Sequence, residues 1–196
     1  MKPEDLYDLI EKKIGDDVNG YTIVDGEGLR LEHGPHINNE KLEEKVLPIL
    51  TEVQWIVTSI LHGVLVEPRY TRQISIQEGE ELYHVSNRTQ RDSILQQGLT
   101  LGTGGNTRLV RKYPPRIFFA KDYEIANKFI DFQCRNTQGV YRDGEIIYNN
   151  PLKDKEDFDV WKIKAEKNIT FYNDILFPNA AVWTESAFPP DRIKHV

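Results

Sequence analysis

Three separate stretches in the second half of the chain contain residue types that suit the binding of a ligand with a planar heterocycle and sugar hydroxyls. His84 lies in the apolar run "LYHV", and strand alternation places it on the same face as an apolar neighbour. Phe118 and Phe119 alternate in another predicted strand, so one can face the core while the other stacks on a planar heterocycle. Glu185 lies near a strand end beside a tryptophan, where a carboxylate can have a raised pKa and bind sugar hydroxyls.

Each of these residues also has an ordinary structural interpretation when it is taken alone. His84 can be a half-buried histidine that a neighbouring group satisfies. Phe118 and Phe119 can both be core residues, and Glu185 can be one of 31 acidic side chains, most of which face solvent. The order and spacing of the three stretches favour a shared site.

That order and spacing resemble the histidine branch of the ADP-ribosyltransferase superfamily. The stretch "LYHVSN…SILQQGL" is similar to the first strand and helix of that fold. "RIFFAKDYEIANKF" resembles the poly-ADP-ribose polymerase segment that holds the middle tyrosine, and "VWTESAFPPDRIKHV" resembles the last strand with its catalytic glutamate and Pro-Pro-x-x-Ile ending. The resemblance covers Glu81 to Val196 and does not extend to the residues before them.

The resemblance implies an α+β domain of split, bent β-sheets with flanking helices and an NAD cleft between the sheets. His84 and Glu185 would be catalytic: His84 would hydrogen-bond the adenosine-side ribose, and Glu185 would stabilise the oxocarbenium ion at the nicotinamide ribose. The implied activity is NAD-dependent mono-ADP-ribosyl transfer to a macromolecular acceptor, with NAD as substrate and no metal ion. The NAD site would also include Tyr83, Ser86 near the nicotinamide end, Phe118 as a stacking wall, and Phe129.

Three departures from the polymerase pattern narrow this expectation. Phenylalanine stands at position 118 instead of tyrosine, so stacking is retained while a hydroxyl contact is lost. Val85 replaces the glycine that lets the polymerase backbone approach nicotinamide. The polymerase stacking tyrosine falls on Lys128 or Phe129, of which only Phe129 can stack. These differences argue against a polymerase and fit a mono-transferase.

Two alternatives remain open from the sequence. RNA 2'-phosphotransferases share the fold, and their final segment is similar to "NAAVWTESAFPPDRI", but "RIFFA" lacks the second histidine and Arg-His-Gly motif of that family. The net charge of −6 disfavours a tRNA substrate, so we expect a protein acceptor rather than a nucleic acid. The third possibility, motivated by Phe118, is a binding module that keeps the fold with an inactive cleft.

A glycine- and arginine-rich loop, "GTGGNTRLVRK", follows shortly after the stretch "SILQQGL". We assign Arg108 and Arg111 to the NAD site, where they would meet the pyrophosphate, while an acidic target or a solvated loop is the alternative. The loop lacks the Lys-Ser/Thr pair of a P-loop. "HGPH" has histidine spacing that a metal could use, but no other ligands cluster with it, so we assign no metal.

The elements that must position these residues alternate between strand and helix. We predict strands at 80–86, 116–120, 144–150, 157–165 and 180–186, and helices at 89–99 and 121–132, the first capped by Asn87 or Thr89 and stopped by Gly98. Short strands outnumber helices, which indicates an α+β fold with a mainly antiparallel or mixed sheet. We assign residues 76–196 to the transferase-like domain.

Residues 1–75 are predicted to form a mostly helical accessory region. Pro3 begins an amphipathic helix, and "YTIVDGEGLRLEHG" predicts a hairpin that turns at Asp25-Gly26. Apolar residues recur at helical spacing through residues 38–65, which predicts a long helix kinked or split at Pro48. Nothing in this region has recognisable catalytic chemistry, so we expect it to pack against the second half.

Composition limits the class of protein. The 196 residues contain a single cysteine, Cys134, which excludes an internal disulfide and a cysteine zinc cluster and fits a cytoplasmic location. The net charge of −6 disfavours a large basic surface for duplex nucleic acid. The N-terminus has no signal-peptide apolar core, and "WIVTSILHGVLV" is too short to span a bilayer, so we expect no membrane association.

Overall fold

The computed structural model describes residues 1–60, 62–101, 115–135, 139–142, 145–148 and 154–196. The chain divides into two compact units, Met1–Arg72 and a second unit that begins at Gln73. Within the described residues, no helix has the length and apolar character needed to cross a membrane.

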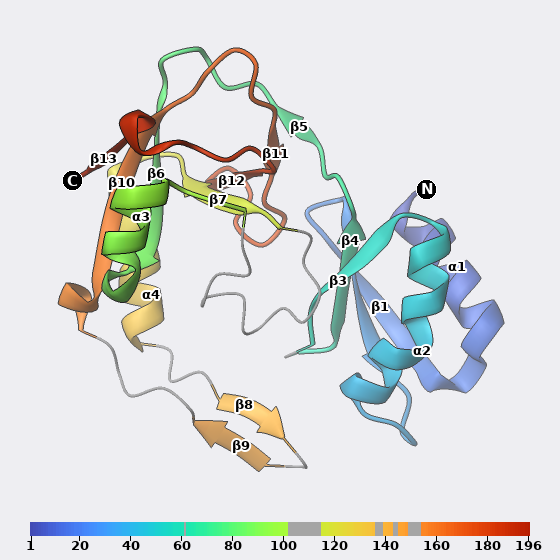
Figure 1. Cartoon of the computed structure of the whole chain (residues 1–196). Helices are drawn as coiled ribbons and strands as arrows, with labels where there is room; N and C mark the ends of the chain where they lie inside the picture. Colours follow the sequence, from blue (N-terminus) through green and yellow to red (C-terminus); the bar gives the residue numbers. More distant parts are fainter. Residues whose placement is uncertain (61, 102–114, 136–138, 143–144, 149–153) are drawn as a thin grey trace. The chain divides into compact units, whose positions relative to one another are not determined.

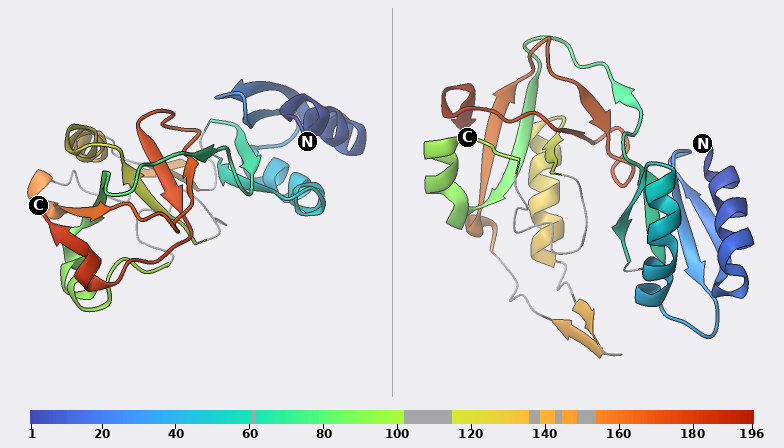
Figure 2. Two further views of the ribbon diagram at one scale, coloured as in Figure 1. Left: turned by 90° about the horizontal axis from the view of Figure 1, so that it is seen from above. Right: turned by 45° about the vertical axis from the view of Figure 1, so that its right-hand side comes forward.

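The first unit combines two helices with a four-stranded antiparallel sheet of strand order β1-β2-β4-β3. Its elements are α1 (Pro3–Ile14), a 3-10 turn (Gly15–Asp17), β1 (Val18–Val24), β2 (Gly28–His33), α2 (Asn39–Glu52), β3 (Trp55–Ser59) and β4 (Val64–Pro68). Both helices lie beside this sheet and share one apolar core with it (Figure 2). The two features predicted at its start are confirmed: Pro3 begins α1, and Asp25 and Gly26 turn the hairpin with φ values of 49° and 70°.

The prediction of a mostly helical region is wrong after Glu52. Helix α2 continues through Pro48 and ends at Glu52, and the next residues form β3 and β4. Gln54, with φ of 60°, ends the helical path. The following apolar run is rich in β-branched residues, and periodicity alone does not distinguish a buried helix from a strand buried on both faces. The first unit is therefore α+β.

The second unit is built on a seven-stranded antiparallel sheet of order β13-β10-β6-β7-β12-β11-β5 (Figure 1). The strands are β5 (Gln73–Ile74), β6 (Glu81–Asn87), β7 (Ile117–Ala120), β10 (Phe158–Lys164), β11 (Phe171–Asn173), β12 (Ala181–Thr184) and β13 (Ile193–His195). The helices are α3 (Arg91–Gln97) and α4 (Tyr123–Arg135), and 3-10 turns lie at Arg88–Gln90, Lys155–Asp157 and Pro190–Arg192. Strand β8 (Gly139–Arg142) pairs with β9 (Glu145–Tyr148) as a separate hairpin. The predicted α+β class is confirmed.

The seven-stranded sheet is nearly divided between β6 and β7. β10 pairs with β6 along its whole length, and β12 pairs with β7 from Ala181 to Thr184. In the described part of the chain, β6 and β7 share only the register pair Tyr83–Ala120. Beyond that pair the two strands diverge, and β7 leaves β6 at a wide angle (Figure 1). The sheet thus has two halves, β13-β10-β6 and β7-β12-β11-β5.

The two faces of this sheet belong to different apolar cores. Leu82 of β6 packs with Phe119 and Trp161 on one face. On the other face, Val85 of β6 packs with Ala126 of α4 and with neighbours on β10. Strand alternation therefore fixes which side chains of β6 can meet which side chains of β7.

The end of α3 is joined to the segment after β12 by backbone pairing. The amides and carbonyls of Leu99 and Phe188 exchange two hydrogen bonds of 2.9 Å. Gly98 ends α3 with φ of 81°, and a Cβ atom at this position would lie 2.0 Å from the Phe188 carbonyl oxygen. Gly98 is therefore required both by its backbone conformation and by the close approach of Phe188.

Candidate functional site

His84 fills the position at which β6 and β7 diverge. Its Nδ1 atom lies 2.9 Å from the Phe118 carbonyl oxygen, and since a carbonyl only accepts, Nδ1 carries the proton. The half-buried ring meets the edge of Phe119, with centroids 5.9 Å apart. Burial lowers the pKa of His84, against a smaller opposing effect of the Phe118 hydrogen bond. The imidazole is therefore neutral near pH 7, and Nε2 has a lone pair with which it can accept a hydrogen bond.

Phe118 lies on β7, the strand beside β6, and Glu185 follows the end of β12, the strand beyond β7. Phe119 is buried in the core, whereas Phe118 is half-buried, as strand alternation suggested. Phe118 pairs in register with Trp183, and Glu185 follows directly on the end of β12 at Thr184. Glu185 is half-buried, with its Oε1 atom inside the surface. The three residues predicted for the site thus come from three consecutive strands.

The register also shows that these residues use different faces of the sheet. Tyr83 pairs with Ala120, so Tyr83 and Phe118 lie on the face of α4, together with Trp183, the partner of Phe118. His84 lies on the opposite face with Leu82 and meets Phe118 only through its backbone. The structure therefore joins His84 to the β7 backbone and leaves the Phe118 ring on the other side.

The remaining predicted NAD-site residues on β6 already have partners within the protein. Ser86 is buried, and its Oγ atom accepts a hydrogen bond of 2.8 Å from the Trp161 indole N–H. The Tyr83 hydroxyl donates to Glu81 Oε2 at 3.1 Å, and the Tyr83 ring meets Tyr123 edge-on at 5.8 Å. Burial and the Glu81 carboxylate raise the pKa of Tyr83. Because the Ser86 oxygen is used as an acceptor, its own hydroxyl hydrogen is directed elsewhere.

Phe129 lies on α4 at the edge of the core on the α4 face. Its ring meets Phe177, from the segment between β11 and β12, with centroids 4.9 Å apart. Arg108 and Arg111, which we predicted for the pyrophosphate, lie outside the described residues.

A stack of three planar groups next to Glu185 was not foreseen from the sequence. The Arg116 guanidinium lies 3.6 Å from the centroid of the buried Trp183 ring, and Tyr172 stacks on the same ring at 4.4 Å. Both groups are thus within stacking distance of Trp183. Arg116 is itself buried. Burial raises the pKa of Asp174, and the backbone hydrogen bonds from Leu176 and Phe177, followed by the charge of Arg116, oppose that rise. No local pattern signals this stack, because its members come from three strand segments.

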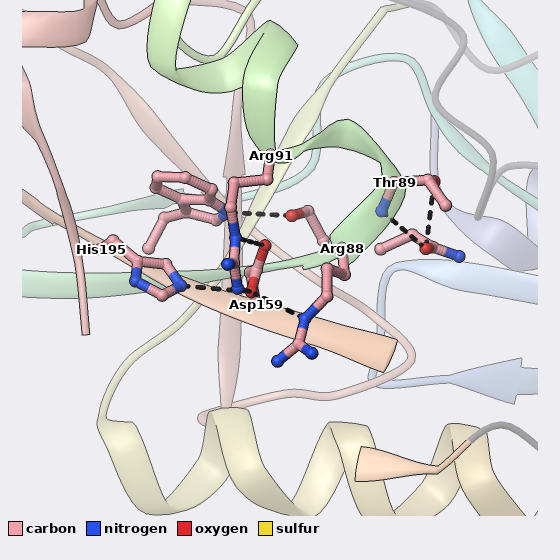
Figure 3. A network of polar contacts seen from close by, with 8 residues as sticks. Arg88, Thr89, Arg91, Asp159 and His195 are labelled. Carbon is pink, nitrogen blue, oxygen red and sulfur yellow. Dashed lines mark hydrogen bonds and ion pairs between the residues drawn. The ribbon is translucent and has the colours of Figure 1, made fainter. Parts of the chain in front are cut away.

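A second unforeseen group surrounds Asp159 on β10 (Figure 3). Arg91 donates two hydrogen bonds to the Asp159 carboxylate, one of them at 2.9 Å, and His195 Nε2 lies 3.2 Å from Oδ1. Arg88 approaches the same carboxylate at 3.9 Å. Arg91, then His195, lowers the pKa of Asp159 despite its burial. This network ties α3, β10 and β13 together, so it supports the half of the sheet that holds His84.

A comparison of the chain with models of known protein families gives no match, and neither does a comparison with curated proteins. The chemistry of the site must therefore be argued from its own groups. These are a neutral imidazole with an available acceptor nitrogen, a half-buried aromatic ring, and a carboxylate at the end of the strand that pairs with that ring's strand.

Proposed function

We propose that the second unit is an NAD-dependent mono-ADP-ribosyltransferase that uses His84 and Glu185. The observation that carries the proposal is the division of the sheet after Tyr83–Ala120, with His84 at the point of divergence and Glu185 at the end of the next strand but one. The division of the sheet and the resemblance of residues 81–196 together support the proposal.

The protonation of His84 suits a role in binding ribose. With its Nδ1 proton committed to the Phe118 carbonyl, Nε2 can accept a hydrogen bond from a sugar hydroxyl. The Phe118 hydrogen bond also fixes the ring, so little side-chain freedom is lost when the ligand binds. We therefore assign His84 to substrate binding and positioning rather than to proton transfer.

Glu185 would act on the bond that breaks. The bond between C1′ of the ribose and the nicotinamide nitrogen breaks, its electron pair leaves with nicotinamide, and the sugar becomes positively charged. A fixed carboxylate lowers the energy of that state. The nucleophilic atom of the acceptor then forms a bond to C1′ and loses its proton.

The test measures nicotinamide release from NAD by the full chain, with and without candidate acceptors. Glu185→Gln keeps the size of the side chain and removes its charge, so we expect a loss of about 10²-fold or more, the scale of one electrostatic contact to a transition state. Glu124→Gln is the matched control, because Glu124 is an exposed glutamate on α4 with 79% of its side chain accessible.

Calorimetric titration with NAD separates binding from chemistry. We expect His84→Ala to abolish saturable binding and Glu185→Gln to retain it. A folded wild-type chain that neither binds NAD nor releases nicotinamide would refute the proposal.

A further inference from the structure

Among the described strands of the first unit, β1 forms an edge of the sheet with no strand on its outer side. Strand order β1-β2-β4-β3 leaves β1 and β3 as the two edges. β3 is buried on both faces, since Val57 is 4% and Thr58 0% exposed. β1 differs, because its residues after Val18 are half-buried or exposed, and in the described part of the chain no strand pairs with its outer side.

Two rows of apolar side chains on the core face of this sheet end at that edge. One row runs from Val66 through Leu29, both fully buried, to Ile23, which is 38% exposed. The other runs through Leu31 to Tyr21, which is 39% exposed. A further strand beside β1 would continue both rows and cover these two side chains.

β1 also has few of the features that protect sheet edges from pairing. Proteins commonly place lysine, proline or inward-facing charge on such strands. "VNGYTIV" contains no charged residue and no proline. The only irregularity is the register shift between Val18 and Gly20, which leaves the segment from Gly20 to Val24 regular.

The charge around this edge favours a basic partner. Residues 1–72 contain 14 acidic and 8 basic side chains, a formal charge of −6, whereas residues 73–196 contain 17 of each. Residues 1–72 therefore carry the whole acidic excess of the chain. Asp16 and Asp17 precede β1, with Lys45 paired to Asp17, and Asp25 and Glu27 follow it, with Arg72 near both. Each end of the strand therefore keeps one more acidic than basic side chain.

This arrangement disfavours a second copy as the occupant. Two β1 strands paired antiparallel would bring the acidic end of each close to the acidic end of the other. A strand with apolar residues at alternate positions and basic residues at its ends would meet both the apolar rows and the acidic ends. We infer that the edge of β1 binds an extended segment of a basic protein by strand addition.

The test is a selection from a random nonapeptide library displayed on phage, with the full chain as target and no NAD present. We expect the selected peptides to alternate apolar residues between lysine- or arginine-containing ends. One synthetic peptide from the selection is then titrated calorimetrically, and hydrogen exchange of residues 20–24 should slow when it is bound.

Two variants with the same added charge separate the apolar contact from electrostatics. Ile23→Lys removes the apolar side chain at the end of one row. It should lower the affinity for the peptide by roughly tenfold or more, because the added strand would cover the exposed part of Ile23. Thr22→Lys places the charge on the opposite face and should weaken it by about twofold at physiological salt. The peptide affinity of Ile23→Thr, which adds no charge, should lie between the affinities of the two lysine variants. Circular dichroism checks that each variant is folded.

Three results would overturn the inference. One is a selection that yields no binder, and another is a binder that is equally tight to wild type and to Ile23→Lys. The third is sedimentation of the free chain as a dimer that Ile23→Lys dissociates, which would identify a second copy as the occupant. None of these readouts depends on NAD cleavage, so the inference and the proposed function can fail separately.

Discussion

The substitution Gly98→Ala tests whether the contact between the α3 end and the segment after β12 holds the second unit together. An alanine Cβ would lie 2.0 Å from the Phe188 carbonyl oxygen and 2.9 Å from the Pro189 carbonyl carbon. Both are backbone atoms, so no side-chain rotation relieves the overlap. The two segments must separate, and the paired hydrogen bonds between Leu99 and Phe188 are lost.

The expected cost is the sum of two effects. Two backbone hydrogen bonds contribute roughly 1 kcal/mol each, and a side chain at φ of 81° costs roughly another 1 kcal/mol or more. The total of about 3 kcal/mol should lower the urea midpoint by about 2 M for a unit of this size. Gly79 is the matched control: its φ is 85°, but a Cβ there meets nothing within 4 Å, so Gly79→Ala should cost only about 1 kcal/mol.

Urea unfolding of both variants should be followed by tryptophan fluorescence in a Trp55→Phe background, which leaves Trp161 and Trp183 of the second unit as reporters. Hydrogen exchange of the amides at positions 99 and 188 gives the local readout. Equal costs for the two alanine variants, with both amides still protected after Gly98→Ala, would show that the close approach is not the reason for glycine.

Two further predictions concern the β6 half of the sheet. Asp159→Asn should destabilise the second unit by about 2–3 kcal/mol at pH 7, below the roughly 3–5 kcal/mol expected for breaking a fully buried ion pair, because the Arg91 side chain is 36% exposed. Since the pKa of Asp159 is lowered in the folded protein, this difference should persist down to about pH 5 and shrink below about pH 4, as urea unfolding against pH would show. Leu82→Ala, at a fully buried position, should cost about 2–5 kcal/mol, whereas Leu95→Ala, at a position that is 56% exposed, should leave the urea midpoint almost unchanged.

Local signals predicted most elements of the second unit and failed where tertiary pairing decides. The alternation around Trp161 and the glycine after "SILQQ" are local features, and β10 and α3 follow them. β11 and β13 have three residues each, too few for alternation to be read, and they exist because β12 and β10 offer edges to pair with. In the first unit, the apolar run after α2 fits both a helical and a strand pattern. It forms β3 and β4, because helix α2 ends before it.

For the candidate site, the sequence predicted which residues are special but not how they meet. Alternation placed His84 on the face of Leu82, which is correct, yet it contains no information that β6 and β7 pair at one position and then diverge. The contact of His84 with the Phe118 carbonyl depends on that divergence. Likewise Arg91 and Asp159 are 68 residues apart, and only the pairing of β6 with β10 brings them together.

The residues that carry the resemblance to the transferases do not all bear on activity. The close approach of the Phe188 backbone explains why position 98 is glycine. His84 donates a hydrogen bond to the Phe118 carbonyl at the point where β6 and β7 diverge. A chain that kept this fold and lost its chemistry would still need these residues, so their presence does not distinguish an enzyme from an inactive binding module. Glu185 offers the sharper test, because the proposed bond cleavage requires its charge. The charge at Glu185, rather than the histidine that first attracts attention, is therefore the decisive test of function.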